Sequence, residues 1–225
     1  MGFSIAIDGP AGAGKSTIAK RLAEELSLIY VDTGSMYRAM ALYFLRFGID
    51  PKDEQAIADA CASIDITITY QDGVQCVLLN GENVNGQIRA EEVGSMASNT
   101  SVYPCVRTKL TDMQRGLART SDVVMDGRDI GTCVLPDAQV KIYLTARTAA
   151  RAKRRYDELL QKGQKADLAQ IEADIAERDY RDMHREIAPL RQAEDAVLVD
   201  SSDMGIAQVT AVIRGIVEKV QKKGN

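Results

Sequence analysis

The residues best suited to chemistry form one continuous run near the N-terminus: Gly9, Pro10, Ala11, Gly12, Ala13, Gly14, Lys15, Ser16 and Thr17. Glycines at this spacing, followed by lysine and a hydroxyl residue, are typical of a loop whose main-chain N–H groups converge on a polyphosphate. We expect Lys15, partly exposed without nucleotide, to reach the outer phosphates and the Ser16 hydroxyl to ligate Mg²⁺. The run predicts a phosphate-binding loop, which switches, motors and kinases all use.

A strand before the loop and a helix after it must position these groups. Residues 3–8 are a short, mostly apolar run that ends at glycine and proline, as a buried strand does. Behind the loop, apolar residues recur at helical spacing: Ile18, Ala19, Leu22, Ala23 and Leu26. The helix N-terminus adds a field that favours an anion. The sequence therefore supplies both elements that the loop requires.

Other charged residues follow two further predicted strands. Residues 29–32 read as a strand, and a helix capped by the hydroxyls of Thr33-Gly34-Ser35 follows, with Arg38 in its first turn and Gly48 at its end. Residues 123–126 read as a buried strand that continues into Gly127-Arg128-Asp129. Open α/β sheets gather their ligands at the carboxyl ends of their strands. We therefore expect a functional role for at least one charge after residue 125.

A small antiparallel sheet is predicted inside this parallel architecture. Residues 64–70 alternate polar and apolar side chains, Asp72-Gly73 predicts a hairpin turn, and residues 74–79 run back before Asn80-Gly81 turns the chain again. Asp50-Pro51 opens a short helix before this sheet. Residues 89–100 and 104–119 read as helices after it, with Ser98 and Arg107 near their junction. We expect this insert to be a lobe that moves.

Two basic helices follow the predicted strand at residues 140–144. The first carries five cations and no acid among them: Arg147, Arg151, Lys153, Arg154 and Arg155. Mutual repulsion favours a lid that contacts polyphosphate, and the alternative is a solvated basic face. In the second helix, over residues 167–186, arginines recur at i, i+3 and i+7, at Arg178, Arg181 and Arg185, with Asp182 one turn on from Arg178. Such a face binds anions or forms ion pairs in solvent.

The whole chain has an ordinary globular composition. Its 225 residues suit one α/β domain with an elaboration, and residues 196–200 and 206–220 supply a last strand and helix. Four dispersed cysteines and a single histidine, His184, suggest neither a zinc site nor a disulfide framework, and we read His184 as a surface or capping residue. The net charge of −4 argues against a nucleic-acid-binding surface. No targeting segment or membrane-span-length apolar run is found, so we expect a cytoplasmic protein. Separately, we expect the protein to be a monomer.

Taken together, five stretches closely resemble the bacterial cytidylate kinase family over nearly the full length. They are residues 9–17, Asp32-Thr33-Gly34-Ser35-Met36-Tyr37-Arg38, the β insert, Asp126-Gly127-Arg128-Asp129-Ile130-Gly131-Thr132, and residues 177–182 through Ala188-Pro189-Leu190. The resemblance implies a P-loop NTPase-type parallel sheet flanked by helices, in one domain over 1–225. Within it, residues 36–100 would form a nucleoside monophosphate (NMP)-binding insert and residues 147–167 a lid.

The resemblance also implies an activity, transfer of the γ-phosphoryl group of ATP to CMP or dCMP with Mg²⁺. Arg38, Arg128 and Arg185 would hold the acceptor phosphate, Arg178 and Asp182 the sugar, and Ser98, Arg107 and Asp129 the cytosine. Thr33 and Tyr37 would join the substrate site, and Arg151, Arg154 and Arg155 the ATP site. Catalysis would rest on Lys15, Arg128, Arg154 and Arg185.

Three rival functions remain open at this point. A kinase of the same architecture could act on another nucleotide or a coenzyme precursor, because the phosphate loop does not discriminate among them. A GTP-dependent switch would normally show an N-K-x-D motif, and none of the five asparagines is followed by lysine. An RNA-associated ATPase is disfavoured by the net charge and the sparse aromatic residues.

Overall fold

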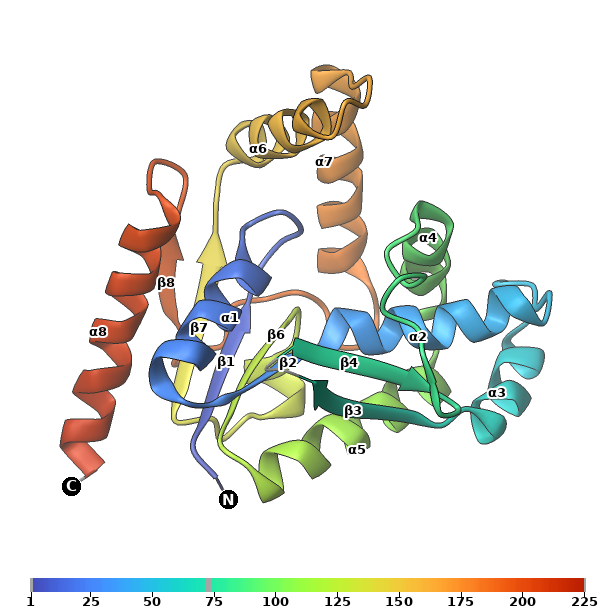
Figure 1. Cartoon of the computed structure of the whole chain (residues 1–225), viewed down its shortest axis with the longest axis horizontal. Helices are drawn as coiled ribbons and strands as arrows, with labels where there is room; N and C mark the ends of the chain where they lie inside the picture. The colour runs from blue at the N-terminus through green and yellow to red at the C-terminus, as the bar shows by residue number, and fades with distance from the viewer. Residues whose placement is uncertain (1, 72–73, 225) are drawn as a thin grey trace. The chain divides into compact units, whose positions relative to one another are not determined.

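The computed structural model describes residues 2–71 and 74–224 and divides into two compact units (Figure 1). Residues 1–30 and 120–225 form one, called here the phosphate-loop unit, and residues 31–119 form the other, the inserted unit. The main sheet has five strands in the order β2-β6-β1-β7-β8. Its strands are β1 (Ser4–Asp8), β2 (Ile29–Asp32), β6 (Val123–Gly127), β7 (Val140–Thr145) and β8 (Val197–Asp200).

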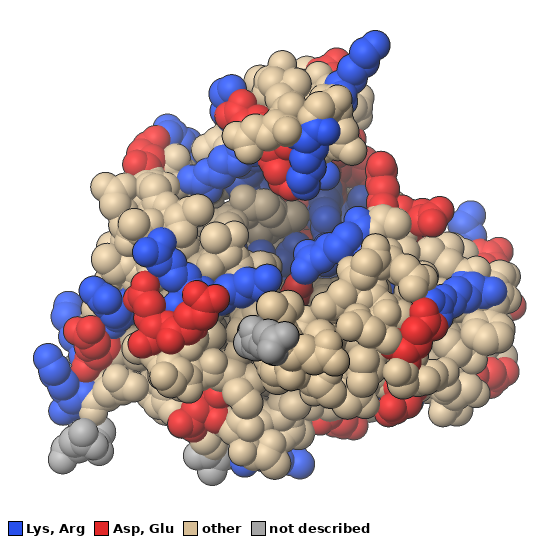
Figure 2. Space-filling view, viewed as in Figure 1, with Lys and Arg blue, Asp and Glu red and all other residues tan. Residues whose placement is uncertain are grey.

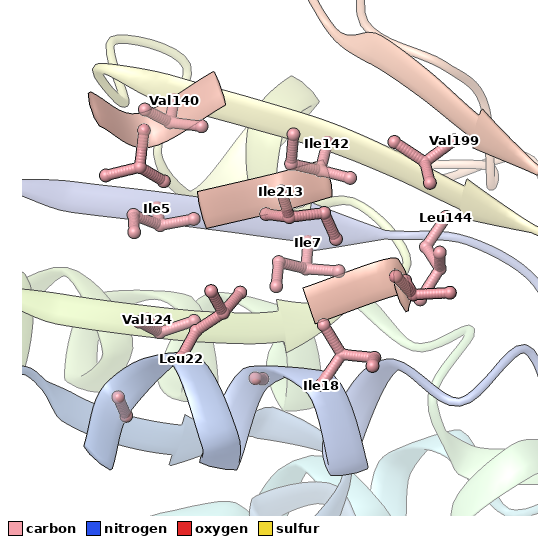
Figure 3. Close-up of a cluster of buried hydrophobic side chains, with 14 of the residues drawn as sticks. Ile5, Ile7, Ile18, Leu22, Val124, Val140, Ile142, Leu144, Val199 and Ile213 are labelled. Carbon is pink, nitrogen blue, oxygen red and sulfur yellow. The ribbon is translucent and has the colours of Figure 1, made fainter. Parts of the chain in front are cut away.

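Strand β1 lies in the middle of this sheet and pairs in parallel with β6 and β7. All five of its residues are buried, as expected for a parallel strand covered on both faces. Helices α1 (Lys15–Leu26) and α8 (Ile206–Gly224) pack on the sheet through Ile18, Leu22 and Ile213 (Figure 3). The core of the unit therefore lies directly behind the loop that joins β1 to α1.

The inserted unit is built around a buried helix, α2 (Thr33–Arg46), in contact with α3, β4 and α4. Its other elements are α3 (Glu54–Ser63), β3 (Ile66–Gln71), β4 (Val74–Leu79), β5 (Glu82–Asn83), α4 (Glu91–Thr100) and α5 (Pro104–Thr120). Strands β3, β4 and β5 form a three-stranded antiparallel sheet. The predicted fold class is thus confirmed: a parallel sheet flanked by helices, with a small antiparallel sheet inserted.

Most predicted turns and helix ends in the described chain are also found. Asn80 and Gly81 both have positive φ at the turn between β4 and β5, and Gly48 has positive φ just beyond α2. The predicted hairpin turn at Asp72-Gly73 lies outside the described residues.

Two predicted helix starts were wrong. Asp32, not the following hydroxyl residues, caps α2, because its carboxylate accepts a hydrogen bond from the Ser35 backbone N–H at 2.9 Å. Helix α3 begins after Asp53, whose carboxylate accepts from the Ala56 N–H at 3.0 Å, whereas Asp50 and Pro51 form a preceding turn. In both places a carboxylate three residues before a free backbone donor decided where the helix starts.

Three further helical segments complete the phosphate-loop unit. A π-helical turn, η1 (Ile130–Val134), follows β6 directly and was not predicted. After β7, helix α6 (Thr148–Gln161) packs against α7 (Leu168–His184), which Asp167 caps through two backbone N–H groups. Among the described residues, no helix is both long and apolar enough to cross a membrane.

Candidate functional site

The loop between β1 and α1 has the backbone geometry of an anion-binding turn. Gly14 precedes α1 with φ of 90°, a value that glycine adopts readily. Because glycine has no side chain to cap the helix, the first N–H groups of α1 stay open to an anion. At Gly9, with φ of 148°, a Cβ atom would lie only 1.9 Å from the Leu144 carbonyl oxygen of β7. Glycine is therefore required for the loop to leave the sheet at this point.

Lys15 begins α1, and its Nζ donates a hydrogen bond to the Pro10 carbonyl oxygen at 2.8 Å. The expectation of partial exposure is wrong, because the side chain folds back under the loop and is only 6% exposed. Burial, and then repulsion from Arg128, lowers the pKa of Lys15 to about 7, while Asp126 and Asp8 oppose the shift. The ammonium is thus held inside the loop among charges of both signs.

Ser16 and Asp126 place two oxygen atoms together beside the loop. The Ser16 Oγ donates to Asp126 Oδ2 at 2.9 Å, and the Tyr30 hydroxyl donates to Asp126 Oδ1 at 2.9 Å. Hydroxyl and carboxylate oxygens are hard ligands that suit Mg²⁺, which usually takes few protein ligands and completes its shell with water and phosphate. The described residues contain no cluster of three or more His, Cys, Asp or Glu side chains that would hold a metal without such help.

Two ion pairs join the segment after β6 to the end of α7. Arg128 Nε lies 2.8 Å from Asp182 Oδ2, and Arg185 Nη2 lies 3.4 Å from Asp129 Oδ1. Burial opposes the charge of Arg128, but the Asp182 carboxylate outweighs it and raises the pKa of Arg128. Burial alone would raise the pKa of Asp182, but the neighbouring Arg128 guanidinium outweighs burial and lowers that pKa. The structure therefore brings four predicted site residues together.

The predicted arginine face of α7 is only partly found. Arg178 and Arg185 are partly buried, but Arg181 is exposed and lies 3.7 Å from Glu177 one turn earlier. The buried face instead includes Asp179, which sequence reasoning missed. His184 is exposed and stacks on Tyr180, with Nδ1 2.8 Å from the Tyr180 carbonyl oxygen, in keeping with a surface residue.

Asp8 is a second buried carboxylate that sequence reasoning passed over. Its two oxygens accept hydrogen bonds from the backbone N–H groups of Ile130 and Gly131 at 2.8 and 2.7 Å. Burial raises the pKa of Asp8 to about 6, and these two backbone bonds oppose the shift. The sequence did hold a signal, because Asp8 ends its strand just as Asp32 ends β2, and Asp126 is the last residue but one of β6.

Four of the five cations around α6 pair with an acidic side chain in the described structure, whereas the sequence had suggested a basic cluster without acids. Arg147 pairs with Asp203, Lys153 with Asp157 at 2.6 Å, and Arg155 with Glu158 at 3.0 Å. The other two, Arg151 and Arg154, bond to groups of the phosphate-loop unit, Arg154 through Ser201. Acidic and basic side chains accordingly mingle over α6 and the adjoining end of α7 (Figure 2). Repulsion is thus relieved within the protein, and it no longer argues for a bound anion.

The inserted unit gathers other predicted residues around the start of α5. Arg107 Nη1 donates to the Ser101 carbonyl oxygen at 3.3 Å, and the Ser101 Oγ donates to the Ser98 carbonyl oxygen at 3.0 Å. The guanidinium carbon of Arg107 lies 5.8 Å from the centre of the Tyr37 ring. Ser98, Arg107 and Tyr37 therefore form one cluster.

Thr33 and Arg38 occupy the first turn and a half of α2, near the Asp32 cap. Thr33 is buried, and Arg38 Nη1 lies 3.8 Å from where a Cβ atom of Gly34 would be. Arg89 Nη2 lies 3.2 Å from Asp32 Oδ2 and adds a second cation beside this helix start. Asp129, the third residue predicted to bind cytosine, belongs to the phosphate-loop unit.

Comparison with known proteins gives one family for a range that includes both the phosphate loop and the later motifs. The family model described as cytidylate kinase matches residues 5–222. The chain belongs to the cytidylate kinase family. It is 50% identical over 220 residues to the cytidylate kinase of Caldicellulosiruptor bescii, covering 98% of this chain and 97% of that protein. It is 48% identical over 220 residues to the cytidylate kinase of Lactobacillus gasseri, covering 98% and 96%.

One solved structure shows a similar fold at low identity. An uncharacterized protein from Eubacterium ventriosum matches with a TM-score of 0.53 and 14% identity, covering 96% of this chain and 98% of its own. At that identity the likeness concerns the fold alone. The assignment to the cytidylate kinase family therefore rests on the sequence relatives.

Proposed function

We propose that this member of the cytidylate kinase family transfers the γ-phosphoryl group of ATP to CMP or dCMP, giving ADP and the nucleoside diphosphate. Family membership over residues 5–222 supports the substrate class. The observation that carries the mechanism is local: one compact unit holds a glycine-rich loop with a buried lysine and two arginine–aspartate pairs. This combination suits phosphoryl transfer, which needs charge neutralisation and alignment more than covalent help.

The acceptor supplies its own nucleophile in this reaction. The second pKa of a phosphate monoester is near 6, so an acceptor oxygen is already anionic at neutral pH and no general base is required. This agrees with a chain whose one histidine is an exposed residue near the end of α7. Lys15 and the arginines instead stabilise charge that shifts between the two nucleotides.

A divalent cation fits beside the loop. Ser16 and Asp126 would hold Mg²⁺, their oxygens being adjacent in the structure. The ion, when bound with ATP, neutralises charge on the β- and γ-phosphates. Tyr30 would orient the Asp126 carboxylate through the hydrogen bond to its other oxygen.

We propose that the acceptor is bound by residues from several segments of the chain. Arg38 from the inserted unit, with Arg128 and Arg185, would bind its phosphate, and Arg178 and Asp182 its sugar. Ser98 and Arg107, together with Asp129, would bind cytosine, with Thr33 and Tyr37 alongside. On this proposal the pairs of Arg128 with Asp182 and Arg185 with Asp129 keep the guanidinium groups oriented before the acceptor arrives.

For the rest of the proposal, residues 36–100 act as the NMP-binding lobe and residues 147–167 as a lid over ATP, with Arg154 and Arg155 in the lid. Small nucleotides would be the only partners, with no nucleic acid polymer, and the protein would be a cytoplasmic monomer. The net charge of −4 supports the absence of a polyanion-binding surface.

A single assay tests the function. ADP release is followed with Mg²⁺·ATP and each of CMP, dCMP, UMP, AMP and GMP in turn. We expect kcat/KM to be highest for CMP or dCMP, by at least about tenfold, because one good base contact discriminates by about 1–3 kcal/mol. Equal or higher values for a purine nucleotide, or no turnover with any of them, would point to a kinase for another acceptor.

A further inference from the structure

Arg151, near the start of α6, donates hydrogen bonds from all three of its guanidinium nitrogen atoms. Its Nε donates to the Ala146 carbonyl oxygen at 2.8 Å, its Nη1 to the Ala11 carbonyl oxygen at 2.8 Å, and its Nη2 to Thr148 Oγ1 at 3.0 Å. The side chain is 4% exposed. Because its N–H groups point at the protein's own oxygens, Arg151 is already engaged where sequence reasoning expected a ligand of ATP.

Asp179, on α7, supplies the counter-charge. Its Oδ2 lies 2.6 Å from Arg151 Nη2, and both side chains are buried. The other oxygen, Oδ1, is buried and has no hydrogen-bond partner among the described residues. Burying two charges is costly, and leaving one oxygen unsatisfied adds to that cost, so a gain in stability does not explain this pair. Fixing a geometry does explain it.

Arg151 bonds to the phosphate loop at Ala11 and lies beside the next residue, Gly12. Beyond the hydrogen bond to Ala11, its Cβ lies 3.5 Å from where a Cβ atom of Gly12 would be, so its stem packs close to the loop backbone. Gly12 has φ of 74°, one of the positive values that curve the loop around its centre. A shift of Arg151 would therefore displace the N–H groups that face a phosphate.

We infer that Asp179 is a positioning residue for the donor nucleotide. It orients Arg151, and Arg151 holds the phosphate loop in its binding conformation at Ala11 and Gly12. Asp179 lies on α7 between Arg178 and Asp182, so the helix that carries proposed acceptor ligands also braces the loop that binds ATP. The inference rests on the proposed function in taking ATP as the donor.

The test is the affinity of Mg²⁺·ATP, measured calorimetrically without any acceptor, for the wild-type protein and for Asp179→Asn. The amide keeps the shape but loses the charge that orients Arg151, so we expect Kd for ATP to rise at least about tenfold. Amide hydrogen exchange at residues 11–14 should become faster in the same variant. Asp174→Asn is the matched control, since it changes an exposed carboxylate on the same helix, outside the proposed lid, and should change neither readout.

The opposite result would identify a different role. If Arg151 is an ATP ligand that Asp179 restrains, removing the carboxylate frees the guanidinium, and ATP binds as before or more tightly. Unchanged Kd and unchanged exchange at residues 11–14, with a lower Tm, would mean that Asp179 only stabilises the fold. Either outcome would overturn the inference.

A second variant covers the case in which Asp179→Asn does not fold. Arg151→Met combined with Asp179→Leu replaces the buried pair by apolar side chains, which proteins often tolerate. We expect this double variant to fold and to bind Mg²⁺·ATP at least about tenfold more weakly. Wild-type affinity would overturn the inference. Because no acceptor is present, a failure here is distinct from a failure to phosphorylate CMP.

Discussion

At the scale of single residues, the Lys15 side chain is buried beneath the phosphate loop. Its ammonium is buried against the Pro10 carbonyl oxygen, and burial lowers its pKa to about 7. A lysine in this state is costly for the apo protein, and a polyphosphate would relieve that cost by supplying negative charge. The same residue therefore links the stability of the loop to ligand binding.

For Lys15→Met we expect kcat to fall at least about 100-fold, roughly 2.7 kcal/mol of barrier, because a charge aimed at the transferred group is removed. Methionine fills a similar volume without a buried charge, so Tm should stay the same or rise. Steady-state rates and thermal unfolding measure both. Lys20→Met, on the exposed side of α1, should behave as the wild type, and turnover of Lys15→Met within about tenfold of wild type would exclude the loop as the site of chemistry.

Asp8 predicts a pH dependence of stability. Burial raises its pKa from 3.8 to about 6, so between those values the folded protein binds more protons than the unfolded chain. The free energy of unfolding therefore falls as pH rises through this window. Asp8→Asn cannot ionise, and its stability relative to wild type should rise by about 1–3 kcal/mol from pH 4 to pH 7. Urea unfolding at several pH values measures this difference, and a constant difference would contradict the prediction.

At the scale of elements, ion pairs join the end of α7 to the segment after β6. Two arginine–aspartate pairs run between them, and each pair combines one residue from each segment. Asp8 anchors the same segment from β1 through the first residues of the π-helical turn. Three elements therefore fix the direction of two guanidinium groups.

Removing either guanidinium should affect catalysis at saturating acceptor. For Arg128→Ala and Arg185→Ala we expect kcat to fall and KM for CMP to rise, because both contacts are proposed to strengthen in the transition state. Arg181→Ala is the matched control on the same helix, since Arg181 is exposed and lies 3.7 Å from Glu177. Exposed ion pairs contribute about 0–1 kcal/mol to stability and nothing to rate. Normal kinetics in all three variants would remove the acceptor-binding role of this face.

At the scale of the whole molecule, the residues proposed to bind the base are widely separated along the chain. Ser98 and Arg107 belong to the inserted unit, and Asp129 belongs to the phosphate-loop unit. The proposed role of each residue in base selection therefore has to be tested by a variant of its own.

Asp129→Ala should lower the preference for CMP over UMP. A carboxylate accepts a hydrogen bond from the cytosine amino group but repels the acceptor that uracil presents at that edge. We expect the ratio of the two kcat/KM values to fall by about fivefold or more, since one base contact is worth about 1–3 kcal/mol. If Asp129 serves only to orient Arg185, both substrates lose activity in parallel and the ratio stays the same.

The sequence by itself determined the architecture and the phosphate loop. Local signals sufficed for this: runs of apolar residues marked the elements, and glycine, proline and aspartate marked their ends. They predicted the bounds of β1, β6 and β7, the inserted sheet and the long helices to within a few residues. The family motifs are equally local, so they identified the kinase family from one chain. Even the wrong helix starts were local errors, in which Asp32 and Asp53 competed with neighbouring caps.

Only the tertiary structure decided what each charge faces. Asp8 meets the N–H groups of Ile130 and Gly131, and Asp179 meets Arg151, across long stretches of chain. Spacing along one helix could not show that Arg181 is exposed and Asp179 is buried. The covered face of α7 is decided by the packing of α6 against it. Burial and charge pairing are set by segments distant in sequence, so the protonation of Lys15 and the support of its loop emerged only from the packed fold.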